Sequence, residues 1–268
     1  MNKKKRDSLY SVWSVLIILS VLLVLFSLLF SSFSKGPDSP GGKKDPATAT
    51  DASPTDIGVQ PLDTAALLGE TADAGDSYVE RITFVSDVTT IGLRTYGILD
   101  GGLDTQKVLS TADGNISLSG ISSVQFSYGE ASASLSAALT TANPDILVIT
   151  LGQNGAAFMG ETYFTSEYTS LIKAAKAACP NAVIICNSIL PVSETYAAAN
   201  TMDADTIRTA NNWIQQAAAD NGCKYAHSFD ALVGENGYLN PKYDSGNGLV
   251  PNSEGLYAML NYLKTHAA

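Results

Sequence analysis

The 268-residue chain contains little cysteine and little histidine, with three Cys and two His in all. Three cysteines are an odd number and too few for a disulfide framework, and no spacing of ligand residues suggests a metal site. No metal and no cofactor are therefore expected. Cys186 lies in an apolar run and is predicted to be a small buried side chain. Cys179 and Cys223 each precede an expected strand, so a disulfide between them stays open.

Positive charge is also scarce, because 16 Lys and Arg stand against 26 Asp and Glu. When the N-terminal residues 3–7 are set aside, 12 basic residues remain against 25 acidic ones. No nucleic-acid partner is expected, since binding phosphates requires a basic surface. The solubility of an exposed domain is a sufficient explanation for the acidic excess.

The longest apolar run covers residues 9–33, is interrupted only by Ser, Tyr and Trp, and follows the basic residues 3–6. It is long enough to cross a bilayer as a helix. A cleaved secretory signal is the alternative, but its apolar region is usually about 7 to 15 residues long and ends in an A-x-A-like site. An uncleaved signal anchor is therefore favoured. Because the basic cluster precedes the run, the amino terminus is expected in the cytoplasm and the rest outside.

The sequence divides into four parts on this basis. Residues 1–8 are the cytoplasmic basic segment and residues 9–33 the transmembrane anchor. Residues 34–61 are rich in Pro, Gly, Ser, Thr, Asp and Ala, so they are expected to form a disordered stalk. Residues 62–268 form one extracytoplasmic domain, which places the protein in the cell membrane as a single-pass protein with its C-terminal domain extracellular.

Within the domain, apolar runs of strand length alternate with amphipathic segments of helical spacing. Strands are predicted at 81–86, 145–151, 182–189 and 224–229, with a short one between 108 and 118; helices are predicted at 89–99, 131–142, 163–178, 203–221 and 253–266; residues 62–69 are a candidate for a short lead-in helix. This alternation predicts a three-layer α/β/α sandwich with a mainly parallel sheet.

Three polar segments follow strands or precede the last helix. The first is the turn after the strand at 81–86, where Ser86 and Asp87 are followed by Thr and Gly residues that lead into a helix. Ligands bind beyond the carboxyl ends of strands in open α/β sheets, so this turn is the expected start of a site. The other two segments are Gly152-Gln153-Asn154 and residues 244–249.

In this order and spacing, residues 78–268 resemble the SGNH or GDSL hydrolase family, in a bacterial, membrane-anchored branch. In that family a Gly-Asp-Ser block holds the nucleophilic Ser, later blocks supply a Gly and an Asn to the oxyanion hole, and Asp-x-x-His precedes the last helix. The resemblance implies an SGNH-hydrolase-like, flavodoxin-like fold. It aligns Gly152 and Asn154 with the third block, and Gly114 with the Gly of the second block.

The chemical positions of the family are all substituted in this sequence. Val88 stands where the resemblance places the nucleophilic Ser, and Ser86 stands where it places the preceding Gly. Ser245 stands at the position of the triad Asp and Gly248 at that of the His. Acyl transfer of this type needs a hydroxyl to attack, an imidazole to take its proton and a carboxylate to orient the imidazole. Valine and glycine can supply none of these groups.

Other residues could stand in for the missing ones. Ser86 and Thr89 lie close to the nucleophile position, and Asp244 lies one residue before Ser245. The base is harder to replace, because the two histidines are His227, inside a predicted strand, and His266, near the end of the last helix. A core or surface role suits each histidine better than a catalytic one.

Three functions follow from these residues. The favoured one is a catalytically inactive domain that binds an acyl ester or acetylated envelope glycan through the donors of Val88 N–H, Gly114 and Asn154. The alternatives are a structural or interaction module of the cell envelope and an active esterase or acetylhydrolase with displaced residues. Asp87 and Thr89 can equally be a helix cap, and an Asn such as Asn154 is common in turns without a ligand.

Overall fold

A computed structural model describes residues 65–128 and 131–268 of the chain. The predicted basic segment, transmembrane anchor and stalk lie outside the described residues. Within residues 65–128 and 131–268, no helix is long and apolar enough to cross a membrane.

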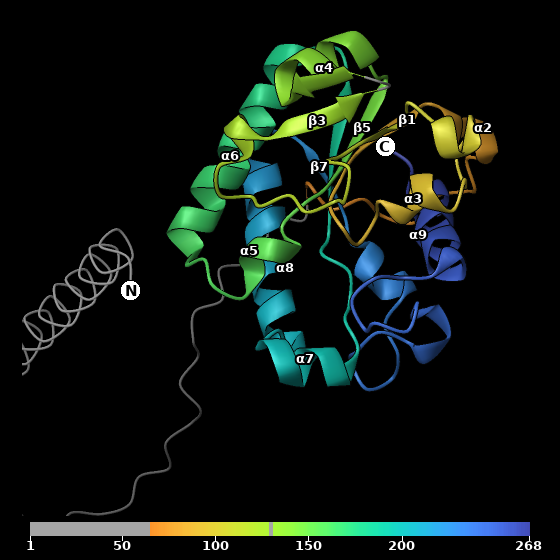
Figure 1. The fold of residues 1–268 in the computed structure, drawn as a ribbon, viewed down its shortest axis with the longest axis vertical. Helices are drawn as coiled ribbons and strands as arrows, with labels where there is room; N and C mark the ends of the chain where they lie inside the picture. Colours follow the sequence, from red (N-terminus) through yellow and green to blue (C-terminus); the bar gives the residue numbers. More distant parts are fainter. Residues whose placement is uncertain (1–64, 129–130) are drawn as a thin grey trace, which may run out of the picture. The chain divides into compact units, whose positions relative to one another are not determined.

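Five parallel strands form the central sheet in the order β2-β1-β5-β6-β7 (Figure 1). They are β1 (Ile82–Ser86), β2 (Val108–Leu109), β5 (Ile146–Thr150), β6 (Val183–Asn187) and β7 (Lys224–Ala226). The chain passes from β1 outward to β2, then returns to the other side of β1 and continues outward to β7. The direction of winding therefore reverses between β1 and β5, and such a reversal opens a crevice at the carboxyl ends of the strands.

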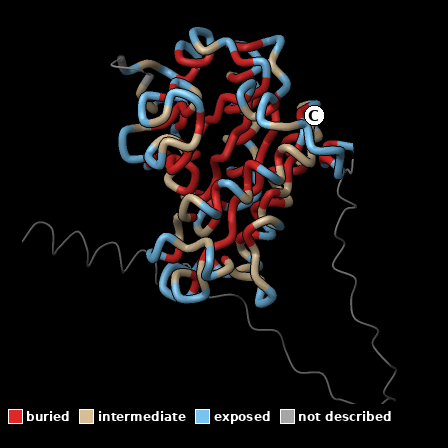
Figure 2. The backbone as a smooth tube through the Cα atoms, turned by 90° about the vertical axis from the view of Figure 1, so that its right-hand side faces the viewer, coloured by how far each residue is buried: buried red, intermediate tan, exposed pale blue. Residues whose placement is uncertain are grey.

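Alternate residues of each strand face opposite layers of helices, which confirms the expected mainly parallel sheet with flanking helices. Val85 and Leu147 belong to one buried cluster, whereas Phe84 and Val148 belong to the other. Figure 2 shows the strands as a buried band between more exposed segments. The helices of the first layer are α4 (Leu135–Ala142), α6 (Glu161–Ala178) and α8 (Ala204–Asp220); those of the second are α2 (Asp76–Glu80), α3 (Gly92–Thr95) and α9 (Ser253–Thr265).

Helical periodicity identified the buried faces of the long helices. The predicted face of α6, with Tyr168, Leu171, Ile172 and Ala175, is buried, and so are Leu256, Met259, Leu260 and Leu263 of α9. The remaining α-helices of the described residues are short and lie at loop positions: α5 (Gln153–Ala156) and α7 (Glu194–Asn200). The 3-10 helices are η1 (Gly102–Asp104), η2 (Ile121–Ser123), η3 (Ser228–Ala231) and η4 (Pro241–Tyr243).

Several predicted elements are shorter than expected. The helix expected at 89–99 is reduced to α3, because residues 88–91 form a turn and Gly97 adopts a left-handed φ of 63°. The first residues of the helix expected at 131–142 form strand β4 (Ala131–Ser134), which pairs antiparallel with β3 (Gln125–Tyr128). The strand expected at 224–229 stops at Ala226.

The lead-in to the domain is extended where a short helix was a candidate. Leu67 bridges Tyr225 in a parallel pairing, and the Leu68 N–H donates to the Tyr225 carbonyl at 2.8 Å. An edge strand offers unpaired backbone groups, and here the lead-in satisfies those of β7.

Candidate functional site

The turn after β1 is built around the side chain of Asp87. Its Oδ1 accepts hydrogen bonds from the Thr89 N–H at 2.9 Å and from the Thr89 hydroxyl at 2.6 Å. Its carbonyl accepts from the N–H groups of Thr90 and Ile91. Asp87 therefore caps this turn, which is the plain role that the sequence suggested for it.

Asp87 is also a buried titratable group at the carboxyl end of β1. Burial raises its pKa to about 6, against the opposing effect of hydrogen bonds from Thr89 and from the backbone N–H of Gln153. Gln153 is the first residue of α5, directly after β5 and Gly152. The carboxyl group of Asp87 thus joins the turn after β1 to the turn after β5.

Val88 and Gly114 lie against one another, as the resemblance implied. Gly114 has a φ of 74°, and a β-carbon on it would lie 2.9 Å from the Val88 Cα and 3.1 Å from the Val88 N. Val88 is half-buried, and its N–H donates no hydrogen bond to any of residues 65–128 or 131–268. The Val88 N–H therefore lies beside the bare backbone of Gly114 and has no partner among the described residues.

Asn154 holds the loop that contains Gly114. Its Nδ2 donates to the Asn115 Oδ1 at 3.1 Å and to the Ile116 carbonyl at 2.9 Å. The three residues predicted to form the donor set are thus brought to one place. Both amide hydrogens of Asn154 are nevertheless donated within the loop, so one of these bonds must open before Asn154 can donate to a ligand.

Gly152 has a conformational and packing role. Its φ is 132°, and a β-carbon there would lie 3.2 Å from both Ile189 Cδ1 and Phe164 Cζ. A side chain here would be strained by the backbone conformation and would have to displace Ile189 and Phe164 slightly.

Ser86, a predicted stand-in nucleophile, is fully buried. It pairs in register with Thr150 of β5, and its carbonyl accepts a 2.6 Å hydrogen bond from the Ser110 hydroxyl. Its own hydroxyl has no hydrogen-bond partner within the described part of the chain. A hydroxyl with no exposed surface is poorly placed to attack a substrate.

A buried row of small polar residues crosses the ends of the strands, and sequence reasoning did not identify it. Ser110, Ser86, Thr150 and Asn187 follow one another on adjacent strands and are each buried. The Thr150 hydroxyl lies 2.5 Å from that of Thr90 and donates to the Val85 carbonyl at 3.1 Å. The signal that could have revealed the row is the polar residue that ends each apolar strand.

Gln153 is a second residue to which the sequence assigned no role. It is 2% exposed, and neither its Oε1 nor its Nε2 has a partner among the described residues. A buried amide without hydrogen-bond partners is costly in free energy. The start of α5 therefore contains a polar group whose hydrogen bonds are not made within the described residues.

The third predicted block, residues 244–249, belongs to different surroundings. The Asp244 Oδ1 accepts from the N–H groups of Gly246 and Gly248 at 2.8 and 2.9 Å, and the Gly248 carbonyl accepts from the Ser193 N–H at 2.7 Å. Ser193 caps α7. A cavity of about 440 Å³ between this loop and α7 is lined by residues of both, and by none from the turns after β1 and β5.

Gly248 leaves no room for the imidazole that the resemblance places there. Its φ is 75°, and a β-carbon on it would overlap the Ser193 hydroxyl and lie 2.9 Å from the Tyr196 Cβ. Ser245, at the position of the triad Asp, is exposed. Position 248 is therefore filled by its neighbours.

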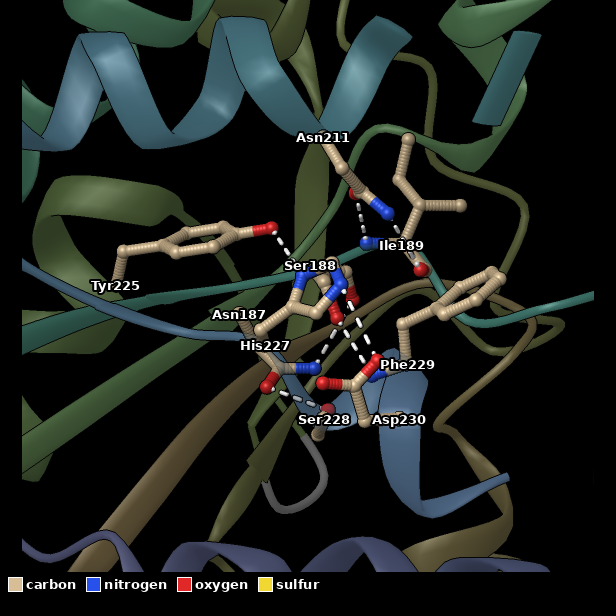
Figure 3. A network of polar contacts seen from close by, with 9 residues as sticks. All are labelled: Asn187, Ser188, Ile189, Asn211, Tyr225, His227, Ser228, Phe229 and Asp230. Carbon is tan, nitrogen blue, oxygen red and sulfur yellow. Dashed lines mark hydrogen bonds and ion pairs between the residues drawn. The ribbon is translucent and has the colours of Figure 1, made fainter. Parts of the chain in front are cut away.

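His227 directly follows β7 and lies in a network of polar contacts (Figure 3). Its Nδ1 lies 2.8 Å from the Tyr225 hydroxyl, and its Nε2 lies 3.5 Å from the Asp230 Oδ1. Burial raises the pKa of Tyr225 well above its usual value, so the Tyr225 hydroxyl stays protonated, and one hydrogen bond joins it to Nδ1. Burial also lowers the pKa of His227, although the charge of Asp230 opposes this. Both ring nitrogens are thus engaged.

Two further contacts of Figure 3 join the segments that follow β6 and β7. The Ser228 hydroxyl donates to the Asn187 Oδ1 at 2.7 Å, and the Phe229 N–H donates to the Ser188 hydroxyl at 2.9 Å. Strands in a sheet lie about 4.8 Å apart, so the three spacings from β7 to β1 place His227 roughly 14 Å from the β1 turn.

His266 lies at the far end of α9. That helix begins beside the β1 turn, where a β-carbon on Gly92 would meet Leu256 Cδ1 at 2.6 Å. His266 follows Leu256 by ten residues, which is about 15 Å along a helix. Its ring stacks on Tyr262 at 3.8 Å between centroids. The structure therefore brings neither histidine to the β1 turn.

All three cysteines are free, so the disulfide left open between Cys179 and Cys223 is absent. Cys186 is buried, as predicted, and its thiol lies within hydrogen-bonding distance of Cys223. Among the residues that the structure describes, no group of three or more His, Cys, Asp or Glu could hold a metal ion.

The sequence model of the GDSL-like Lipase/Acylhydrolase family matches residues 99–256. This match contains Gly114, Asn154 and the loop at 244–249, and it begins after the β1 turn. A comparison with curated proteins gave no match.

Solved structures with a similar arrangement of the chain are distant in sequence. A GDSL-like lipase from Bacteroides thetaiotaomicron is 21% identical, over 72% of this chain and 88% of that chain, with a TM-score of 0.46. A predicted acylhydrolase from Bacteroides fragilis is 18% identical, over 80% and 96%, with a TM-score of 0.48. The OSK domain of Drosophila Oskar is 14% identical, over 69% and 87%, with a TM-score of 0.45.

Proposed function

Because the chain belongs to the GDSL-like lipase/acylhydrolase family, we propose that its domain binds an acyl ester or an acetylated glycan in the family's crevice without cleaving it. The observation that carries this proposal is the N–H of Val88, which lies beside Gly114 and donates to none of the described residues. Backbone N–H groups at such a position stabilise a carbonyl oxygen that carries partial negative charge. A ligand with a carbonyl group is therefore the chemistry that suits this donor.

The proposed lack of hydrolysis rests on the groups that surround this donor. Val88 has an isopropyl side chain, and Ser86 is fully buried. His227 lies three strands away, where Tyr225 and Asp230 engage both of its nitrogens. A hydroxyl and an imidazole within hydrogen-bonding distance of each other are the minimum for this type of acyl transfer.

An interaction module with no ligand in the crevice is the second candidate. One observation favours it, which is that both amide hydrogens of Asn154 are donated to the Gly114 loop. If these bonds do not open, the crevice offers one donor fewer than the family's arrangement. No comparable observation favours an active esterase.

The proposal includes attachment to the membrane and exposure of the domain outside the cell. It rests on the sequence of residues 9–33 and on the basic residues before them. A domain held in this way would meet envelope glycans, which is why an acetylated glycan is included in the ligand class.

Binding can be tested on the full-length protein with acetylated xylo-oligosaccharides. The same oligosaccharides after alkaline deacetylation serve as the matched control, because they differ only in the carbonyl groups. We expect the backbone amide resonance of Val88 to shift with the acetylated ligand and to stay in place with the deacetylated one. If neither ligand moves this resonance, the interaction module replaces the binding function.

Two variants distinguish an effect on binding that comes from the Gly114 loop from a general effect of removing a side-chain amide. Asn154→Ala is expected to weaken binding of the acetylated oligosaccharide, because it releases the loop that carries Gly114. Asn212→Ala removes an amide on α8 that donates no hydrogen bond to a described residue, and it should leave binding unchanged. Equal loss in both variants would contradict a site at Val88.

A further inference from the structure

A second cavity, of about 350 Å³, lies in the second helix layer, beside α9. It is enclosed by α2, by residues 98–107 and by α9, which are neighbours in Figure 1. None of Val88, Gly114 and Asn154 lines it, so it is separate from the crevice and does not depend on the proposed function. Its lining residues are Asp76, Val79, Glu80, Ile98, Leu99, Asp100, Lys107, Tyr257, Leu260, Asn261 and Lys264. We call this cavity the α2–α9 groove.

The floor of the α2–α9 groove is apolar. Leu99 and Leu260 are buried, and Val79 and Ile98 are half-buried beside them. Tyr257 lines the groove and is 52% exposed, although large aromatic side chains are usually covered in a folded domain. The volume falls within the range of small-molecule sites, roughly 300 to 1,000 Å³. An apolar floor with an exposed aromatic ring suits a ligand with an apolar body.

The charges around the groove favour a cation. Its lining includes three carboxylates and two ammonium groups. Lys264 lies 3.1 Å from Asp76, so these two charges are paired. Glu80 and Asp100 make no ion pair with any described residue, and Lys107 is the one remaining positive charge of the lining. The excess of acidic residues over the whole chain adds to a field that attracts cations.

We propose that the α2–α9 groove binds a small organic amine. Its apolar body lies on Leu99 and Leu260, and its ammonium group faces the unpaired carboxylates Glu80 and Asp100. Tyr257 covers the body with the face of its ring, where an aromatic side chain also attracts a nearby cation.

Tryptamine is a suitable probe, since it joins an aromatic body to an ammonium group. Indole-3-propionate has the same ring system and a carboxylate in place of the ammonium, so it tests the charge alone. With the full-length protein at low salt, we expect tryptamine to bind with a dissociation constant of about 1 mM, as its size allows. Indole-3-propionate should bind at least about tenfold more weakly, because the carboxylates repel it. Resonances of Ile98 and Leu260 should shift on binding.

Variants assign the effect to named side chains. The double variant Glu80→Gln/Asp100→Asn should weaken tryptamine binding at least about fivefold, while Glu161→Gln on α6 serves as a matched control and should not. Tyr257→Ala should weaken binding, and Tyr257→Phe should retain it, because the ring rather than the hydroxyl makes the contact. Equal affinity for the two indoles, an unaffected double variant, or resonance shifts away from the groove would each overturn the proposal.

Discussion

The β1 turn and the loop at 244–249 were both expected to contribute to one site, yet the structure holds them in different ways. At the β1 turn, Val88 lies against Gly114, and Asn154 holds the same loop. The loop at 244–249 instead packs on α7, through the hydrogen bond from the Ser193 N–H to the Gly248 carbonyl. The predicted donor residues meet where the sheet holds the turns, whereas the loop at 244–249 is held by α7.

The physical difference lies in what holds each segment. The β1 turn is fixed by the register of β1 with β5, from Ile82 opposite Ile146 to Ser86 opposite Thr150. Asp87, buried between the two strand ends, adds a further tie. The loop at 244–249 is shaped by local turns around Asp244 and Asn247. Local turns can be rebuilt without disturbing the core, whereas a strand register cannot.

The largest effect is expected when a His is placed at position 248. Gly248→His forces a side chain into the space of Ser193 and Tyr196 at a φ of 75°, so it should lower the free energy of unfolding by at least about 3 kcal/mol. Urea denaturation measures this. Gly246→Ala is the matched control, since its φ is 102° but nothing lies within 4 Å, and it should cost only about 1 kcal/mol. If Gly248→His is as stable as the unaltered protein, Ser193 and Tyr196 do not close position 248.

The second effect is a dependence of stability on pH that comes from Asp87. Its pKa is about 6 in the folded protein and near 4 when exposed, so the folded state binds the proton more tightly. The contribution of Asp87 to stability is therefore full below pH 4 and is lost as the pH rises to 6, by about 3 kcal/mol. Unfolding should be compared between the unaltered protein and Asp87→Asn at pH 4, 5, 6 and 7.

The difference between these two proteins isolates Asp87 from the other carboxyl groups. Asp113 and Asp203 have lowered pKa values, mainly because the backbone N–H groups of Asn115 and Thr206 donate to them. Their contributions to stability are therefore lost as the pH falls below their pKa values, which is the opposite direction to that of Asp87. If the difference in the free energy of unfolding between the two proteins does not change between pH 4 and 6, burial does not raise the pKa of Asp87 in the folded protein.

A smaller effect is expected at Gly114. Gly114→Ala brings a β-carbon to 2.9 Å from the Val88 Cα at a φ of 74°, and it should destabilise the fold by about 2 kcal/mol. It should also cover the Val88 N–H and abolish binding of the acetylated oligosaccharide. Gly120→Ala, with a φ of 81° and nothing within 4 Å, should cost about half as much and leave binding intact. Thermal denaturation of both variants tests the close contact directly.

The smallest effect is expected from the hydrogen bonds of Asn154. Asn154→Ala removes its bonds to Asn115 and Ile116 and should cost about 1 to 2 kcal/mol, whereas Asn115→Ala removes one of the two and should cost less. Hydrogen exchange of the amides at 111–116 should rise in both variants. If neither variant changes exchange, Asn154 does not hold the loop, and its role as a ligand donor gains support.

The sequence predicted the parts of this fold that depend on long periodic patterns. The strand at 145–151 and the buried face of α6 around Tyr168 follow from apolar runs and helical spacing, and both are present. The β3–β4 hairpin was missed, because residues 131–134 are Ala and Ser and do not show a strand composition.

The candidate site was predictable only where residues lie next to a strand end. The resemblance grouped Val88 and Asn154, and both contact the loop at 114–116 because they follow β1 and β5, which are neighbours in the sheet. The closure of position 248 could not, since it depends on Ser193, more than fifty residues earlier in the sequence. The raised pKa of Asp87 likewise depends on burial by distant segments.

The central claim is that the domain keeps a donor site at Val88 without the chemistry of hydrolysis, and p-nitrophenyl acetate tests it most directly. The full-length protein should release p-nitrophenol at the rate of the buffer alone, and His227→Ala and Ser86→Ala should not change that rate. Turnover above this background that either substitution abolishes would contradict the account.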